Sequence, residues 1–307
     1  MFNFENLLEL TKQISVSSVI VLLFIFITTT LYSYRYCILL KYFNIKLSLI
    51  DSIKVTVIAT LGSYLTPFIS GSFAAKTMMV SRYSGCTKAL SLGMVSYEKG
   101  FEVFWLASVS MIVLSLIPDW LPEKDVQYMI VVSLAILFII LMTIFLVNKL
   151  LPGIFYIVRF TPNKIQSFFL IRGVTKEKII GILEKIKELV RNPKLFIGLL
   201  IPTIPSFFIP GLIVYIISKN LGGDLTFNQA LIVYWIPNIF GKLSGIPGGV
   251  GSQDISMGFL LNYYGVDLIT SAQIAAGYRF ITMTYIFLSS GIVILSEGKD
   301  LLKSIKN

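Results

Sequence analysis

The chain has 307 residues, of which 55% are hydrophobic and only 14% are charged. Soluble globular domains contain about 25% charged residues, so this composition excludes an ordinary soluble enzyme and indicates a membrane protein. The 26 basic residues outnumber the 16 acidic ones, and in a membrane protein such an excess usually lies on the cytoplasmic face. We therefore expect no nucleic-acid partner.

The sequence contains no histidine, which excludes histidine-based acid–base catalysis and histidine metal sites. The two cysteines, Cys37 and Cys86, are too few for a disulfide framework and do not form a Cys-x-x-Cys metal motif. We therefore expect no bound metal ion and no cofactor.

Apolar runs along the chain predict membrane helices, each of which needs about 20 residues to cross about 30 Å of hydrocarbon. We predict about six full spans and up to two partial ones, which makes the chain an all-α, polytopic integral membrane bundle. The whole chain, residues 1–307, is expected to form a single multi-pass domain in the cell membrane. In chain order the runs are 14–34, 53–70, 101–117, 128–147, 195–217 (interrupted by prolines), 230–246, 255–264 and 272–295.

The distribution of charge between these runs predicts their orientation. Segment 148–194 carries ten basic residues against three glutamates, so the positive-inside rule places it in the cytoplasm. The acidic loop 118–127 then lies outside, whereas the loop with Lys41 and Lys46 lies inside, as does the C-terminus. This orientation requires segment 53–70 to enter and leave on the same side.

The same argument applies later in the chain, where the short run 255–264 is too short to cross. Two re-entrant hairpins, at 53–70 and 230–264, satisfy the orientation, and interrupted segments at matching positions of two halves are typical of a transporter binding site. We therefore predict two pseudo-repeated halves with re-entrant hairpins. The alternative is that Pro67 and Pro247 kink ordinary spans, which membrane helices tolerate.

A basic segment at 161–193 has apolar residues at three- and four-residue spacing, which predicts a cytoplasmic amphipathic helix. Such a helix either lies on anionic lipid or connects the spans beneath the bundle. Both roles remain open.

Charged residues inside apolar runs are costly, which makes them candidates for function. Glu98 and Glu102 lie four residues apart on one helix face, where they would bind a cation, pair with arginines or act as an acid–base pair. Alternatively, Lys99 and the nearby basic loop neutralise them. Arg279 lies inside the last run, and it either snorkels to the surface or faces inward, where it would hold an anionic headgroup or pair with Asp254.

The run Pro-Gly-Gly-Val-Gly-Ser-Gln-Asp at 247–254 is rich in glycine. It lacks the Gly-Lys-Ser/Thr ending of a nucleotide-binding loop, but its glycines allow a sharp reversal of the backbone. The next helix is expected to begin at Ser252 or Asp254. Its N-terminus would then face an anion such as a lipid phosphate.

These motifs, taken in order, resemble the lysylphosphatidylglycerol synthase transmembrane-region family, over roughly residues 10–297. This family is the flippase-like membrane module of multiple peptide resistance factors, also found alone, and some members are linked to polyprenyl-lipid glycosylation. The resemblance is carried by Arg35 with Leu39-Leu40, the turn 67–71, Lys76 with Arg82, Glu98-Lys99, the glycine run 247–254 and Tyr278-Arg279.

The chain departs from the family pattern in both hairpins. A Gly-Glu pair is usual in the first, whereas Ser72 follows Gly71 here and Lys76 takes the basic place; in the second, Asp254 replaces a glutamate. The expected lipid-binding residues are Arg35, Lys76, Glu98, Glu102, Gly248, Gly249, Gly251, Asp254 and Arg279.

The resemblance implies a protein of cell-envelope biogenesis that binds a phospholipid or polyprenyl-phosphate lipid, with an anionic headgroup, or moves it between leaflets. Lysine transfer is not expected, because the sequence has no aminoacyl-transferase domain. Two alternatives stay open. One is a membrane glycosyl- or acyl-transferase that uses carboxylates, and the other is an accessory subunit of an envelope-lipid synthase. A partner protein of envelope synthesis or a homo-oligomer is compatible with each.

Overall fold

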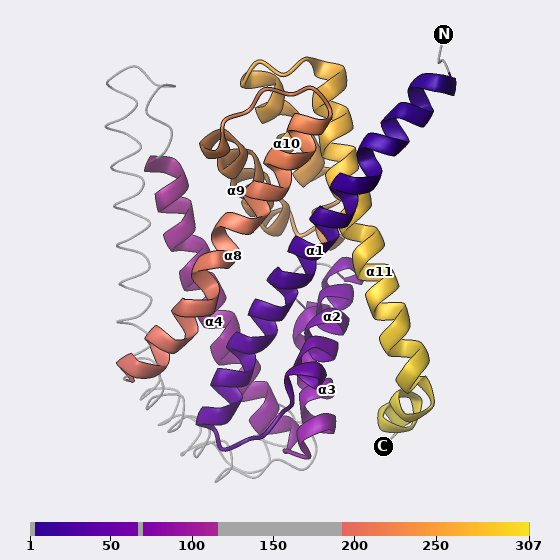
Figure 1. The fold of residues 1–307 in the computed structure, drawn as a ribbon. Helices are drawn as coiled ribbons and strands as arrows, with labels where there is room; N and C mark the ends of the chain where they lie inside the picture. Colours follow the sequence, from indigo (N-terminus) through magenta and orange to yellow (C-terminus); the bar gives the residue numbers. More distant parts are fainter. Residues whose placement is uncertain (1–3, 67–69, 116–191, 307) are drawn as a thin grey trace. The chain divides into compact units, whose positions relative to one another are not determined.

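A computed structural model describes residues 4–66, 70–115 and 192–306, and within these ranges every regular element is helical (Figure 1). The prediction of an all-α membrane protein is confirmed. The predicted outside loop 118–127 and the span 128–147 lie beyond the described residues, as does nearly all of the amphipathic segment 161–193.

The described helices fall into two sets with the same order of lengths, in which two short helices lie between two long ones. This order agrees with the expected pseudo-repeat. The first set is α1 (Phe4–Tyr42), α2 (Leu49–Leu65), α3 (Ser70–Ser84) and α4 (Lys88–Ser115). The second set is α8 (Pro193–Asn220), α9 (Phe227–Leu243), α10 (Ser252–Tyr263) and α11 (Leu268–Lys306).

Among the described residues, three helices are long and apolar enough to cross a membrane. These segments are Ser18–Tyr42 in α1, Lys194–Asn220 in α8 and Leu268–Gly298 in α11, and they coincide with three of the predicted runs. The expected interruption of α8 by its prolines is wrong. Its three internal prolines leave the helix continuous, because neighbouring groups in a membrane bundle can satisfy the carbonyls that a proline frees.

The two short helices of the second set form a hairpin. A single 3-10 turn, η2 (Pro247–Gly249), joins α9 to α10, which packs against both α9 and α11. Helix α10 has 12 residues, and at 1.5 Å per residue it is about 18 Å long, well short of the hydrocarbon thickness. This length supports the re-entrant interpretation of residues 230–264.

The chain divides into two compact units, each described by itself below. Unit 1 comprises Met1–Arg35, Leu49–Ala75 and Ile201–Asn307, and unit 2 comprises Tyr36–Ser48 and Lys76–Leu200. Unit 1 therefore holds the hairpin of α9 and α10 together with α2 and the whole of α11.

Glycines allow close backbone contact within unit 1. A Cβ atom on Gly62 of α2 would lie 2.7 Å from the carbonyl oxygen of Gly71 in α3, and one on Gly249 would lie 3.0 Å from the Cα atom of Gly241 in α9. The first distance excludes a side chain unless the backbone shifts, and the second is tighter than ordinary contact. Glycine pairs thus bring α2 close to α3, and α9 close to the η2 turn.

Candidate functional site

Arg279 holds the turn of the second hairpin. Its Nε donates to Asp254 Oδ1 at 2.8 Å, and its Nη1 donates to the Gly248 carbonyl at 2.8 Å. Its Nη2 donates to the Gly249 carbonyl at 3.4 Å and to Gln253 Oε1 at 3.3 Å. We call this group of five residues the Arg279 clasp.

The glycine run explains why the chain reverses here. Gly248, Gly249 and Gly251 have φ angles of 61°, 64° and 82°, a left-handed conformation that other residues adopt only at a cost. Helix α10 begins at Ser252, as expected. Asp254 Oδ2 accepts a hydrogen bond from the Gly251 N–H at 3.0 Å, so the chain's own carboxylate caps the N-terminus at which we expected a phosphate.

The clasp is largely hidden from solvent, since the side chain of Arg279 is 11% exposed and that of Asp254 is 28% exposed. Of the arrangements considered for Arg279, the structure shows the inward ion pair rather than snorkelling. An unpaired charge at this depth would cost at least about 2.5–3.5 kcal/mol on insertion scales. The two residues therefore stabilise each other.

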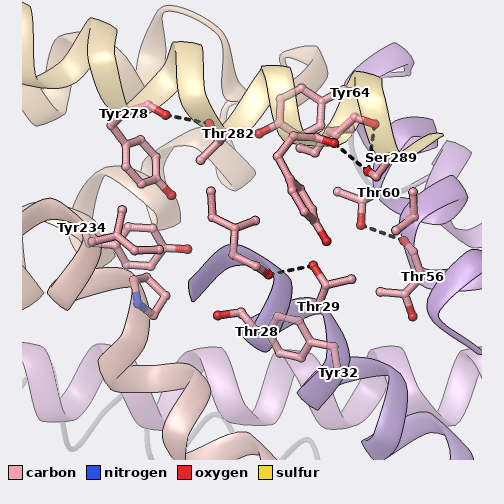
Figure 2. Close-up of a pocket in the computed structure, with 16 residues that line it drawn as sticks. Thr28, Thr29, Tyr32, Thr56, Thr60, Tyr64, Tyr234, Tyr278, Thr282 and Ser289 are labelled. Atoms are coloured by element: carbon pink, nitrogen blue, oxygen red, sulfur yellow. Dashed lines mark hydrogen bonds between the residues drawn. The ribbon is translucent and has the colours of Figure 1, made fainter. Parts of the chain in front are cut away.

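A cavity of about 200 Å³ lies in the same unit, lined by sixteen residues (Figure 2). Eleven of them carry hydroxyl groups, and the other five are aliphatic or proline. Figure 2 shows the phenol oxygens of Tyr234 and Tyr278 pointing into this space from α9 and α11. Sequence reasoning missed the cavity.

Three lining residues connect the cavity with the clasp. Tyr278 precedes Arg279 in α11, and the hydroxyl of Thr282, one turn later, donates to the Arg279 carbonyl at 3.0 Å. Tyr64, another lining residue, packs on the turn so closely that a Cβ on Gly248 would lie 2.7 Å from its ring. The end of α2 and the hairpin tip thus meet at the cavity.

A second predicted residue, Arg35, adjoins another residue of the cavity lining. Arg35 is buried, with 1% of its surface exposed, and its guanidinium carbon lies 5.1 Å from the ring centroid of Tyr32. Tyr32 also lines the cavity. Two arginines therefore contact or adjoin its tyrosines, although neither lines the cavity itself.

Lys76 and Glu98 form a separate site in unit 2. Lys76 Nζ lies 2.6 Å from both carboxylate oxygens of Glu98, and the two side chains are 5% and 3% exposed. The same ammonium lies 4.1 Å from the ring centroid of Tyr36. The structure therefore does not bring Lys76 and Glu98 into the clasp as partners of Arg279.

A joint role of Glu98 and Glu102 was one of two alternatives from the sequence, and in the structure the two carboxylates have different partners. Glu102 Oε2 lies 2.8 Å from Lys99 Nζ, and the Glu102 side chain is 36% exposed. This is a partly exposed pair within one helix, as in the alternative in which Lys99 neutralises it. Within the described residues, no group of three acidic or cysteine side chains is placed to hold a metal ion.

The missed cavity had only a weak signal in the sequence. Thr28, Thr29 and Tyr32 interrupt the first apolar run with hydroxyl groups, but such residues are common in membrane helices, where they bond to their own backbone. Their convergence with tyrosines of α2, α9 and α11 depends on tertiary packing. The spacing of residues within one helix therefore does not predict that these hydroxyl groups meet at one cavity.

Comparison with known proteins relates this geometry to a family. The family model described as the lysylphosphatidylglycerol synthase TM region matches residues 1–290. The chain belongs to this family. It is therefore a membrane protein of a family associated with lipid metabolism, as its sequence motifs suggested.

Two curated relatives are archaeal proteins, each named UPF0104 membrane protein. One, from Pyrococcus horikoshii, is 27% identical over 296 residues, which cover 91% of this chain and 86% of the relative. The other, from Methanothermobacter thermautotrophicus, is 31% identical over 77 residues, which cover 25% of this chain and 23% of the relative. No solved structure matches the chain significantly.

Proposed function

We propose that this member of the family is a multi-pass protein of the cell membrane that binds the phosphate-bearing headgroup of a lipid and moves the lipid between leaflets. The observation that carries the proposal is the cavity of unit 1, a hydroxyl-lined space with Arg279 beside one set of its tyrosines and Arg35 stacked on another. The hydroxyl oxygens of this lining can accept hydrogen bonds from a headgroup, while the apolar side chains between them make up most of the cavity surface.

Arg279 is the group that would receive the phosphate. A guanidinium binds phosphate through two parallel N–H bonds, and in the structure Asp254 and the Gly248 carbonyl accept hydrogen bonds from these groups. A lipid phosphate competes with Asp254 for Arg279, which releases the hairpin turn from α11. Binding is thereby coupled to a change at the hairpin tip.

Lipid movement in reconstituted vesicles tests this proposal. We expect Arg279→Ala to reduce the rate of fluorescent phosphatidylglycerol movement, followed by dithionite quenching, by at least about tenfold, the equivalent of one lost charge-assisted bond. Arg279→Lys should retain part of the rate, because it keeps the charge but not the bidentate geometry. Asp254→Asn should change the rate while leaving the helical content intact.

The matched control is Lys219→Ala, which removes a basic residue whose partner, Asp224, is 94% exposed. This variant should move lipid at the rate of the unmodified protein. If Arg279→Ala folds normally and moves lipid as fast as the control, the proposed site is wrong.

A further inference from the structure

Both sets of described helices contain an ion pair that joins the second short helix to the long helix after it. In the second set this pair is Asp254 of α10 with Arg279 of α11, at 2.8 Å. In the first set it is Lys76 of α3 with Glu98 of α4, at 2.6 Å. Arg279 and Glu98 lie 11 and 10 residues after the first residue of their helices. The two pairs therefore occupy corresponding places in the pseudo-repeat, with their charges reversed.

The Lys76–Glu98 pair is almost completely buried, since its side chains are 5% and 3% exposed. Stability alone does not favour such a pair, because apolar residues of similar volume often replace a buried ion pair without loss of stability. Ionisable groups held inside a membrane protein are instead candidates for a function, and proton transfer is a common one.

Further titratable groups lie around this pair, on α1 and α4. Lys76 Nζ lies 4.1 Å from the ring centroid of Tyr36 in α1, a fully buried residue. The Oη of Tyr36 makes no hydrogen bond within the described residues, and a buried hydroxyl in that state needs a reason other than packing. Lys99 and Glu102 of α4 also act on Lys76 electrostatically, but they pair with each other at 2.8 Å. A change of charge at the buried pair is thus poorly compensated by solvent.

The chemistry of the pair selects a proton as its ligand. A metal cation such as calcium requires several oxygen ligands, and within the described residues no three acidic or cysteine side chains gather to supply them. A proton requires only one oxygen. When a proton binds a carboxylate oxygen of Glu98, the carboxylate becomes a neutral acid and its ionic attraction to Lys76 is lost. Release of the proton restores the ion pair between α3 and α4.

We propose that Glu98 carries a proton and that the protein moves one proton together with each lipid phosphate, in the same direction. This inference rests on the proposed function and gives it a driving force, the proton gradient. In the second hairpin a phosphate competes with Asp254 for Arg279, and in the first a proton competes with Lys76 for Glu98. A phosphodiester carries one negative charge, so the two ligands together cross the membrane potential without net charge.

A pH gradient across sealed vesicles that contain the full chain tests the inference. The probe is fluorescent phosphatidylglycerol, and dithionite measures its fraction in the outer leaflet, while valinomycin and potassium hold the membrane potential at zero. With the interior more alkaline by about one pH unit, one proton per lipid should enrich the probe in the inner leaflet about tenfold at equilibrium, relative to protein-free vesicles. An equal distribution in spite of the gradient, or enrichment on the acidic side, would overturn the inference.

Three variants compare the buried pair with the partly exposed one. Glu98→Gln keeps the shape of the protonated acid, so it should exchange lipid between leaflets at equal pH but lose the enrichment. The double variant Lys76→Met with Glu98→Leu removes both buried charges together, and it should lose the enrichment as well. Glu102→Gln is the matched control, one turn further along α4, and it should enrich the probe as the unmodified protein does. Enrichment that survives in the double variant, or that Glu102→Gln loses equally, would show that Glu98 does not carry the proton.

Failure of this inference differs from failure of the proposed function. If the unmodified protein exchanges the probe at equal pH faster than Arg279→Ala does, but no pH gradient enriches it, lipid movement stands and proton coupling is wrong. If the unmodified protein exchanges the probe no faster than protein-free vesicles at any pH, the proposed function itself fails, and the inference fails with it.

Discussion

Burial distinguishes the ion pairs of this protein at the scale of single residues. Lys76 and Glu98 are 5% and 3% exposed, whereas Lys99 and Glu102, one turn further along α4, are 19% and 36% exposed. Removing one partner of a buried pair leaves the other charge without compensation, and this costs far more than the pair itself contributes. An exposed pair contributes about 0–1 kcal/mol.

We therefore expect Lys76→Met to lower the free energy of unfolding by about 3–5 kcal/mol. The double variant Lys76→Met with Glu98→Leu should recover most of this loss, because neither charge then remains buried. Unfolding in mixed detergent–SDS micelles, followed by circular dichroism, measures both values. Lys99→Met is the control, with an expected change below about 1 kcal/mol.

If Lys76→Met destabilises the protein no more than Lys99→Met does, the Lys76–Glu98 pair does not stabilise unit 2 as its burial implies. An unrecovered double variant would instead show that the packing of these two side chains matters more than their charge.

Sequence reasoning singled out Arg279, Asp254 and the glycine run because charges and glycines in apolar segments are rare and costly. These residues meet in one clasp because Asp254 lies in α10 and Arg279 lies in α11, the next helix along the chain. The pairing of Lys76 with Glu98, rather than of Glu98 with Glu102, depends instead on how α3 packs against α4. Residue spacing within one helix does not predict which of its side chains pairs with a side chain of a neighbouring helix.

At the scale of elements, paired glycines define both hairpins. Helices α2 and α9 each have 17 residues, and each approaches a following segment at a glycine, Gly62 in α2 and Gly241 in α9. At Gly62 an added Cβ would meet backbone atoms of Gly71 at 2.7 and 2.8 Å. Backbone atoms cannot rotate away as a flexible side chain does, so the two arms would have to separate.

Alanine at Gly62 should therefore destabilise the protein, by about 1–3 kcal/mol as for overpacked cores. Gly100 is the matched control, since it also lies within a helix but a Cβ there would meet nothing within 4 Å. Gly100→Ala should be neutral or stabilising by up to about 1 kcal/mol, because alanine favours helix more than glycine does. Thermal unfolding in detergent compares the two, and equal transition temperatures would contradict the close contact of α2 with α3.

The sequence predicted the elements themselves well where they were long and apolar. Runs 14–34, 195–217 and 272–295 all became helices of membrane-spanning length. The short helices were harder to predict, since run 53–70 proved to contain the end of α2 and the beginning of α3. The prolines of α8 misled the prediction because their effect depends on neighbours that a single sequence does not show.

At the scale of the whole molecule, the second hairpin determines how many times the C-terminal half crosses the membrane. Helix α10 is too short to span, and the tip at η2 contacts α2 and is held by Arg279 of α11. Apolar side chains on either side of this tip, Leu243, Ile246 and Val250, are exposed, which suits contact with hydrocarbon better than contact with solvent. The charge pattern independently predicts that the loop between α8 and α9 lies outside and the loop between α1 and α2 inside.

Accessibility to a membrane-impermeant thiol reagent in sealed vesicles tests this topology, in a chain whose two cysteines are first replaced by serine. Cysteines at Asp224 and Asp267, on either side of the hairpin, should both react only from outside, and one at Asn44 should react only from inside. A cysteine at Ile246, at the tip, should not react from inside, because a re-entrant hairpin never reaches that face. Labelling of Ile246→Cys from the inside, with Asn44→Cys as the positive control, would show that α9 and α10 cross completely. Reaction of Asp224→Cys and Asn44→Cys from the same side would overturn the orientation derived from the basic residues.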